Sequence, residues 1–220
     1  VRYCSDMSQK MLDRFGEFDR PAFDLLHFHD WHVVDALTRL RERETVFTYH
    51  STEFGRSGNR YSDEWLFPAI SGAERRGGEI AKRVTAVSST LRREAMNLYD
   101  IPDWKIDVVQ NGIIPGHYRA DVDPEAVKQR YGFDPGAPLI LFVGRLMWQK
   151  GPDMLVDAAP RLLQEHADSQ FAFVGDGQMR RGLEAQARSL PVRFLGRLDD
   201  ADYVSLLNAS DIVAIPSRNE

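Results

Sequence analysis

The sequence has few of the features that mark several large classes of protein. It holds a single cysteine in 220 residues, so no internal disulfide framework can form, and we expect the reducing environment of the cytoplasm. No apolar run approaches the roughly 20 residues of a membrane-spanning helix. Lysine and arginine form no dense run and the formal net charge is −5, which disfavours general nucleic-acid binding. Neither nucleic acid nor an integral membrane segment is therefore expected.

Short apolar runs alternate with helix-like segments along the chain. This alternation is typical of parallel α/β sheets rather than of sandwiches or helix bundles. The expected strands lie at 24–29, 45–50, 83–88 and 106–109 in a first set, and at 139–143, 170–174, 192–195 and 212–215 in a second set. The expected helices lie at 32–43, 66–76 and 89–99, and near 153–165, 179–189 and 200–208.

A polar stretch with proline, glycine and several acids separates the two sets. We therefore predict an α/β domain over 1–115, a linker over 116–137 and a second α/β domain over 138–220. Two such domains facing each other across a cleft would direct their strand ends toward one shared ligand. Because the chain opens on Val1 and stops at Glu220 directly after an apolar run, we expect an internal fragment in which both domains are truncated.

The most informative segment follows the strand expected at 139–143. Gly144 and Arg145 end this strand, and Lys150 precedes a helix with Pro152 in its first turn. A helix N-terminus favours anions, and the planar guanidinium of an arginine matches phosphate oxygens. Arg145 and Lys150 are therefore predicted to bind a diphosphate and to stabilise it as a leaving group. The alternative is that both are ordinary surface charges of a loop.

The other strands of the second set should end at the same edge of the sheet. Their glycines would let the backbone approach a ligand closely. Arg180 stands where a dinucleotide-binding fingerprint needs its last glycine, so a Rossmann cofactor site is not predicted. The residues expected at this edge, besides Gly144, Arg145 and Lys150, are Gly175, Gly177, Gly196, Arg197 and Glu220.

A histidine-rich segment ends the first expected strand. Strand alternation places His27 and His29 on one side of the sheet, while Asp30 can cap the next helix. With His32, these residues also suggest a zinc-dependent hydrolase, although the acid lies one place early for the pattern His-x-His-x-Asp-His. A structural role in packing explains His27 well and His29 less well.

His50 ends the second expected strand and precedes a polar, glycine-rich loop that contains Glu53. Such a loop suits a mobile lip around a polar ligand such as a sugar. A plain connecting loop is the alternative.

Taken together, these segments resemble the retaining GT-B glycosyltransferases of the glycosyltransferase 4 family, close to the glycogen and starch synthase branch. In the second domain the resemblance rests on residues 143–145, 149–151, 174–177, 194–196 and 216–220. In the first domain it rests on residues 28–32 and on His50 with the loop after it. The resemblance implies the GT-B fold, which has two Rossmann-like parallel-sheet domains.

The resemblance also implies roles for individual residues. Arg145 and Lys150 would hold the donor diphosphate, and His29 would lie under the donor sugar near its anomeric centre. Glu220 matches the first acid of the family's Glu-x7-Glu signature, which contacts hydroxyls of the donor sugar. The remaining expected contacts are Gly144, Gly175 and Gly177 in the donor groove, Gly196 and Arg197 at the nucleobase, and Asp30, His50 and Glu53 in an acceptor or cleft loop.

The activity implied by the resemblance is transfer of a hexose, with glucose as the first candidate, from a nucleotide-diphosphate sugar to a carbohydrate hydroxyl such as that of an α-glucan. Metal-liganding acids are not clustered, so no metal site is predicted and no cofactor is expected to be required; Mg²⁺ can accompany the nucleotide. Parts of the family pattern lie outside residues 1–220, which puts the activity of the isolated chain in question. The alternatives are the zinc hydrolase and a non-catalytic nucleotide-sugar-binding chain.

Overall fold

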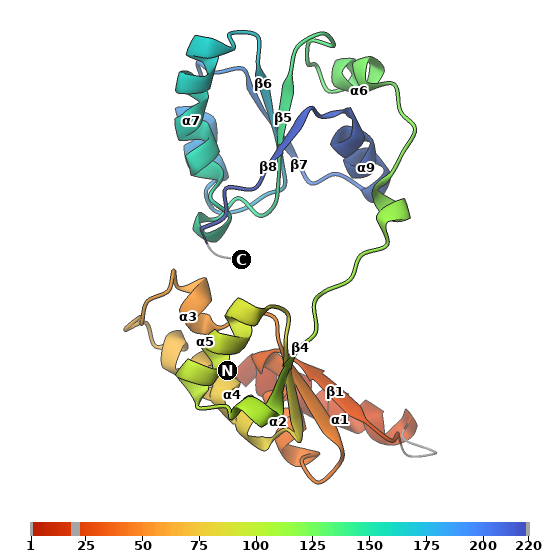
Figure 1. Ribbon diagram of the computed structural model, residues 1–220, viewed down its shortest axis with the longest axis vertical. Coiled ribbons are helices and arrows are strands. Elements are labelled where there is room, and N and C mark those ends of the chain that lie inside the picture. The colour runs from red at the N-terminus through yellow and green to blue at the C-terminus, as the bar shows by residue number, and fades with distance from the viewer. Residues whose placement is uncertain (1, 19–22, 219–220) are drawn as a thin grey trace. The chain divides into compact units, whose positions relative to one another are not determined.

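The computed structural model describes residues 2–18 and 23–218 (Figure 1). The chain divides into two compact units, Val1–Gly112 and Ile113–Glu220. Each unit contains a four-stranded sheet in which all neighbouring strands are parallel. The prediction of an α/β protein with two parallel sheets is confirmed.

In the first unit the strand order is β1-β2-β3-β4. The strands are β1 (Leu26–His29), β2 (Thr45–Tyr49), β3 (Arg83–Ala86) and β4 (Ile106–Val108). The helices are α1 (Arg2–Phe18), α2 (Val34–Arg39), α3 (Glu53–Arg56), α4 (Leu66–Ile80) and α5 (Ser89–Tyr99), with 3₁₀ turns at Trp31–Val33 and Asp103–Lys105. The helix expected at 32–43 is shorter than predicted, and the sequence analysis did not anticipate α1 and α3.

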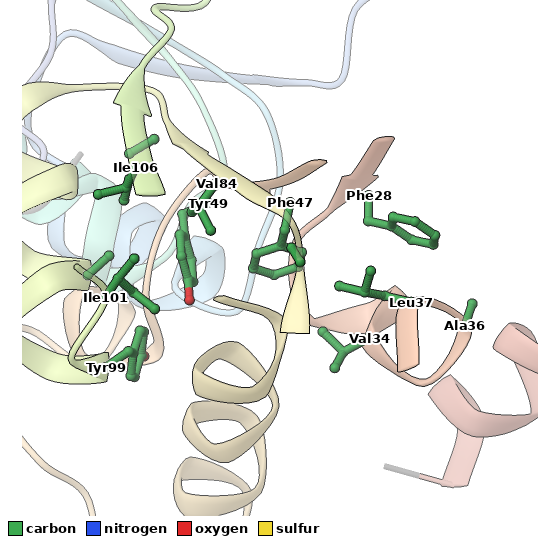
Figure 2. Close-up of a cluster of buried hydrophobic side chains, with 13 residues drawn as sticks. Phe28, Val34, Ala36, Leu37, Phe47, Tyr49, Val84, Tyr99, Ile101 and Ile106 are labelled. Carbon is green, nitrogen blue, oxygen red and sulfur yellow. The ribbon is translucent and has the colours of Figure 1, made fainter. Parts of the chain in front are cut away.

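One face of the first sheet forms the hydrophobic core of this unit. The parallel register aligns Phe28 with Phe47, Phe47 with Val84 and Val84 with Ile106, and all four side chains are buried. Figure 2 shows these residues together with side chains from α2 and α5. Helix α4 packs so closely that a Cβ on its Gly77 would lie 2.6 Å from Cζ of Phe47. Helices therefore fix the positions of the strands from this side.

In the second unit the strand order is β7-β6-β5-β8. The strands are β5 (Leu139–Val143), β6 (Gln170–Val174), β7 (Val192–Gly196) and β8 (Ile212–Ala214). The helices are α6 (Pro124–Arg130), α7 (Pro152–Glu165), α8 (Arg180–Gln186) and α9 (Asp200–Ala209), with 3₁₀ turns at Pro115–Tyr118 and Trp148–Lys150. The predicted strands at 139–143 and 170–174 match β5 and β6 residue for residue.

Helices cover both faces of the second sheet. Helix α7 lies on one side of the sheet in Figure 1, and α6 and α9 lie on the other. Ile140 and Phe142 of β5 join a core cluster with α7 and α8, whereas Leu139 and Leu141 join a second cluster with α9. The continuous apolar run of β5 is therefore explained by burial on both faces, as the sequence predicted.

Helix α6 lies within the stretch 116–137, which the sequence analysis assigned to the linker. The side chain of Lys128 is buried in this helix, and its Nζ donates to the carbonyl oxygen of Ala137 (2.9 Å) and to Oδ2 of Asp211 (2.8 Å). The same Oδ2 atom accepts a hydrogen bond from the N–H of Leu139 at 2.7 Å. Helix α6 is thus tied to the start of β5 and packs as part of the second unit.

Candidate functional site

The carboxyl ends of β5, β6 and β7 are joined through the backbone. The N–H of Gly144 donates to the carbonyl oxygen of Val174 at 3.0 Å, and the N–H of Gly175 donates to that of Gly196 at 2.7 Å. Three consecutive strand ends therefore meet at one edge, as expected from the positions of their glycines.

Gly175 and Gly177 are required by close contact between neighbouring turns. Gly175 has a φ of 124°, and a Cβ there would lie 2.0 Å from the carbonyl oxygen of Gly144. A Cβ on Gly177 would lie 2.4 Å from the carbonyl oxygen of Leu146. The N–H of Leu146 also donates to the carbonyl oxygen of Asp176 at 3.0 Å. The group that approaches these glycines in the structure is thus the neighbouring turn, and contact with a ligand stays a prediction.

Two adjoining pockets open at this edge of the second sheet, with volumes of about 330 Å³ and about 450 Å³. Arg145, Asp176 and Arg197 line both pockets. The side chains of Arg145 and Arg197 are exposed, and neither makes a hydrogen bond or ion pair with any residue in the described part of the chain. Two guanidinium groups with unused donors beside a pocket form a suitable environment for an anion.

Lys150 lies beside the same strand end. It closes the 3₁₀ turn Trp148–Lys150, Gly151 follows in a left-handed conformation (φ 62°), and α7 begins at Pro152. The Cγ of Lys150 would lie 3.9 Å from a Cβ built on Gly144. The prediction that Lys150 stands at a helix N-terminus is confirmed. Glu220, the fourth predicted catalytic residue, lies outside the described residues.

Arg218 is a residue of this region that the sequence analysis missed. Its guanidinium forms two hydrogen bonds with the carboxylate of Asp153, in the first turn of α7. The hydrogen bond to Arg218 holds the pKa of Asp153 below its ordinary value of 3.8. The two residues are 65 positions apart in the sequence, so no local pattern could have indicated the contact.

The strand ends of the first sheet bring His29 and His50 together. Nδ1 of His29 lies 2.9 Å from Nε2 of His50, and the two rings stack with their centroids 5.2 Å apart. One ring nitrogen must donate in this hydrogen bond and the other must accept, so the proton positions on the two rings are linked.

Asp30 does not cap a helix, so this prediction was wrong. Its side chain makes no capping hydrogen bond with the 3₁₀ turn that follows. Instead, Oδ1 of Asp30 accepts a hydrogen bond from the N–H of His50 at 3.1 Å. The backbone of Asp30 is left-handed, with a φ of 61°, a conformation that aspartate tolerates better than most residues. The turn after β1 is thereby tied to the end of β2.

The histidine cluster does not form the metal site of the zinc hydrolase alternative. The ring of His32 stacks on Trp31 with the centroids 4.0 Å apart, and Nε2 of His27 is hydrogen-bonded to Oγ1 of Thr48 at 2.6 Å. Nowhere in residues 2–18 and 23–218 are three His, Cys, Asp or Glu side chains placed to share a metal ion. The histidines predicted as zinc ligands therefore make separate contacts with other side chains.

His27 belongs to a polar row on the face of the first sheet opposite the core. The Oγ1 of Thr48, to which it is bonded, also lies 2.6 Å from Oγ1 of Thr85 on β3. Burial lowers the pKa of His27, and nearby His29 and His50 lower it further. The structural role that the sequence allowed for His27 is the one that its contacts support.

The loop after β2 is fixed at its start by a buried carboxylate. Glu74 of α4 is 1% exposed, and its Oε2 accepts hydrogen bonds from the N–H of Glu53 (2.9 Å) and from the hydroxyl of Tyr99. Its Oε1 pairs with the guanidinium of Arg56 at 2.5 Å. Burial raises the pKa of Glu74, against the opposing effect of Arg56. The segment expected as a mobile lip is therefore held firmly where Glu53 begins α3.

Two family profiles match the chain. Glycosyltransferase Family 4 matches residues 6–116, and Glycosyl transferases group 1 matches residues 123–220. The chain therefore belongs to the glycosyltransferase 4 family, and the family membership expected from the sequence is confirmed. In the described part of the chain, no helix has both the length and the apolar character needed to cross a bilayer.

Individual proteins agree with this assignment. An uncharacterized glycosyltransferase of Methanocaldococcus jannaschii is 33% identical over 224 residues, which cover 97% of this chain and 57% of the relative. The glycogen synthase of Mycobacterium tuberculosis is 30% identical over 210 residues, which cover 90% of this chain and 47% of the relative. The chain thus spans about half the length of the curated relatives it matches.

A solved structure establishes the fold. The crystal structure of Anabaena HepE in complex with UDP and glucose superimposes with a TM-score of 0.74 at 22% identity, covering 96% of this chain and 56% of that protein. The two parallel-sheet units therefore have the GT-B architecture expected from the sequence.

Proposed function

We propose that this protein is a retaining glycosyltransferase that moves a hexose, glucose being the first candidate, from a nucleotide-diphosphate sugar to a carbohydrate hydroxyl. The observation that carries this proposal is the cationic edge of the second sheet. There, Arg145 and Arg197 line the pockets without partners among the described side chains, and Lys150 lies beside them at the start of α7.

The chemistry of glycosyl transfer accounts for these cations. Cleavage of the bond between the anomeric carbon and the diphosphate leaves negative charge on the departing oxygen. Fixed positive groups aimed at that oxygen lower the barrier because they need no reorganisation during the reaction. We assign this role to Arg145 and Lys150. No cofactor is needed for the scheme, although Mg²⁺ can accompany the nucleotide.

The remaining assignments rest on the family motifs. His29 is proposed to contact the donor sugar near its anomeric centre, and Glu220 to bind its hydroxyls. Gly144, Gly175 and Gly177 are proposed to line the donor groove, with Gly196 and Arg197 at the nucleobase. Asp30, His50 and Glu53 are assigned to the acceptor or cleft loop.

The comparisons support the classes of donor and acceptor. The Anabaena protein was crystallised with UDP and glucose, which supports a nucleotide-sugar donor. The Mycobacterium relative is named a glycogen synthase, which supports an α-glucan acceptor. The single cysteine supports a cytoplasmic site of action.

Calorimetric titration of the 220-residue chain with ADP-, UDP- and GDP-glucose, with and without Mg²⁺, tests the donor site. We expect micromolar affinity for one of the three, and loss of that affinity in Lys150→Ala. Arg161→Ala is the matched control, because Arg161 is an exposed cation further along α7. Lack of binding by the unaltered chain, or full binding by Lys150→Ala, would refute the assignment.

Turnover separates a transferase from a binding protein without catalysis. In an assay of glucose transfer to a glucan, Lys150→Ala should lower kcat/KM by an amount equivalent to at least ~2 kcal/mol of transition-state stabilisation, comparable with removal of one oxyanion donor. An unchanged kcat/KM would exclude Lys150 from catalysis. Nucleotide-sugar binding without any transfer would favour the non-catalytic alternative.

A further inference from the structure

The segment after β8 is bonded to the turn that carries Lys150. The backbone N–H of Arg218 donates to the carbonyl oxygen of Gln149 at 2.8 Å. Nη1 of Arg218 donates to the carbonyl oxygen of Trp148 at 2.7 Å. Both acceptors belong to the 3₁₀ turn that ends at Lys150. One residue therefore contacts this turn through its backbone and its side chain.

The Arg218 guanidinium is held on three sides. Nη1 and Nη2 donate to the two carboxylate oxygens of Asp153 at 2.9 Å and 2.6 Å, which is the bidentate geometry. The guanidinium carbon lies 5.0 Å from the centre of the Trp148 ring, within the range of a cation–π contact. The side chains of Arg218 and Asp153 are each only 23% exposed. Arg218 is thus occupied by protein contacts and links the turn to the first turn of α7.

The backbone fits as closely as the side chains. The carbonyl oxygen of Pro216 would lie 2.1 Å from a Cβ on Gly151, so only glycine fits at this position. Gly151 is the residue between Lys150 and α7, and its left-handed conformation also favours glycine. The segment after β8 and the turn before α7 therefore pack backbone against backbone.

The turn is itself a short 3₁₀ segment. Within it, the N–H of Lys150 donates to the carbonyl oxygen of Met147 (3.0 Å) and the N–H of Gly151 to that of Trp148 (3.1 Å). Short 3₁₀ segments have poor hydrogen-bond geometry and are readily deformed. The external contacts from Arg218 therefore add support to the turn.

We propose that Arg218 is a positioning residue, which clamps the turn 148–151 against α7 and thereby fixes Lys150 for binding of the donor diphosphate. The choice of ligand rests on the proposed function. Arg218 acts through Lys150 and does not itself contact the diphosphate, since Asp153 occupies its guanidinium. Small displacements of a positioned charge have large effects on catalysis and affinity, so loss of the clamp is expected to weaken the site without removing any of its cations.

The first measurement is nucleotide-sugar affinity by calorimetry, with the nucleotide sugar that the unaltered chain binds. Arg218→Leu is expected to weaken binding at least tenfold. Arg218→Lys keeps the charge but not the bidentate pair, and should restore part of the loss. Asp153→Asn should weaken binding as well, and the double variant should lose little more than Arg218→Leu, because the two side chains act as one unit.

Arg130→Leu is the matched control. Arg130 also pairs with an aspartate, Asp202, at 2.7 Å, and its guanidinium carbon lies 5.5 Å from the ring centre of Tyr131. This pair joins α6 and α9, away from the turn 148–151. We expect unchanged nucleotide-sugar affinity, which would separate the clamp from the general effect of losing an Arg–Asp pair in this unit.

Hydrogen exchange gives a readout that does not depend on the ligand. In Arg218→Leu, the amides of Lys150 and Gly151 should exchange faster while those of β5 and β6 keep their rates. Unchanged exchange and unchanged affinity in Arg218→Leu, with normal binding by the unaltered chain, would overturn the clamp and leave the proposed function intact. Failure of the unaltered chain to bind any nucleotide sugar would overturn the proposed function and, with it, the ligand named here.

Discussion

The turns at the ends of the two sheets depend on side chains to different extents. In the first sheet, side-chain contacts add to the backbone hydrogen bonds between strand ends: His29 contacts His50, and the carboxylate of Glu74 accepts from the N–H of Glu53. In the second sheet, the turns after β5, β6 and β7 are joined by backbone hydrogen bonds at glycines. The polar side chains of the first edge are therefore occupied by one another. At the second edge, the side chains of Arg145 and Arg197 beside the pockets make no hydrogen bond or ion pair within the described part of the chain, whereas Asp176 accepts from the N–H of Gly177.

Removal of the buried carboxylate of Glu74 should disrupt the first edge and cause the largest loss of stability among these substitutions. Glu74→Ala leaves Nη2 of Arg56, the Tyr99 hydroxyl and the N–H of Glu53 without their acceptor, while Nε of Arg56 keeps its bond to Glu53. We expect a loss of about 3 kcal/mol in the free energy of unfolding of the first unit, since removal of a buried carboxylate leaves several donors without an acceptor. This loss can be measured by hydrogen exchange of the β2 amides as a function of urea concentration.

Glu79→Ala is the control for this prediction, because Glu79 lies on the same helix with an exposed side chain. It should change the free energy of unfolding by less than about 0.5 kcal/mol. Equal effects of the two substitutions would mean that the buried network does not stabilise the first edge.

At the second edge, a substitution that adds a single methyl group should disrupt the contacts between the turns. Gly175→Ala places a Cβ 2.0 Å from the carbonyl oxygen of Gly144 in a backbone conformation that favours glycine. We expect a loss of about 2 kcal/mol in the free energy of unfolding of the second unit, from steric overlap and backbone strain together. Hydrogen exchange of β5 and β6 amides in urea is the measurement.

Gly182→Ala provides the comparison within the same unit. Gly182 lies in α8, where nothing stands within 4 Å of an added Cβ. Alanine is the better helix former, so this change should be neutral or stabilise the unit by up to about 1 kcal/mol. A Gly175→Ala protein as stable as Gly182→Ala would show that the turns can separate at no cost.

The amino-terminal end of the second sheet extends the comparison, because the ion pair between the side chains of Lys128 and Asp211 lies there. Hydrogen bonding to Lys128 holds the pKa of Asp211 below its ordinary value of 3.8. A lowered pKa contributes stability that is complete above the ordinary value and is lost as the pH falls through the folded-state pKa. Because Asp211 is half exposed, we expect Asp211→Asn to reduce the free energy of unfolding by only about 1 kcal/mol at neutral pH.

Urea unfolding as a function of pH checks this expectation. The difference between Asp211→Asn and the unaltered chain should persist at neutral pH and shrink as the pH falls below 3.8. Asp168→Asn, at an exposed position, is the control. The loss caused by Gly175→Ala should not depend on pH in this way, since it comes from a steric contact. A difference for Asp211→Asn that stays constant down to acid pH would contradict the assignment to ionisation.

Much of the fold could be predicted because its signals are local. Apolar residues fill β5 and all of β6 after Gln170, and the structure buries most of them on both faces. Helix α6 was missed because Asp123 and Pro124 are equally typical of a linker and of a helix start, and only packing against the second unit decides between them. Helix α1 was missed although Met11, Leu12 and Phe15 recur at helical spacing.

The residues of the candidate site divide in the same way, into those indicated by local sequence and those that depend on folding. The position of Lys150 before α7 follows from a strand, a turn and a helix that are adjacent in the sequence. The contact between Arg218 and Asp153 and the burial of Glu74 depend on segments that meet only in the folded chain. The sequence could therefore indicate where the proposed anion site lies, but not which side chains hold its surroundings in place.

The backbone contacts between the glycine turns also bear on protein engineering. Since main-chain atoms hold the turns together, the side chains at Asp176, Gln178, Arg197 and Tyr203 can be exchanged without removing those contacts. A combinatorial library varied at these four positions, with Gly175 and Gly177 kept, should retain its fold in most members. This edge of the chain is thus a natural starting point for directed evolution of altered ligand preference.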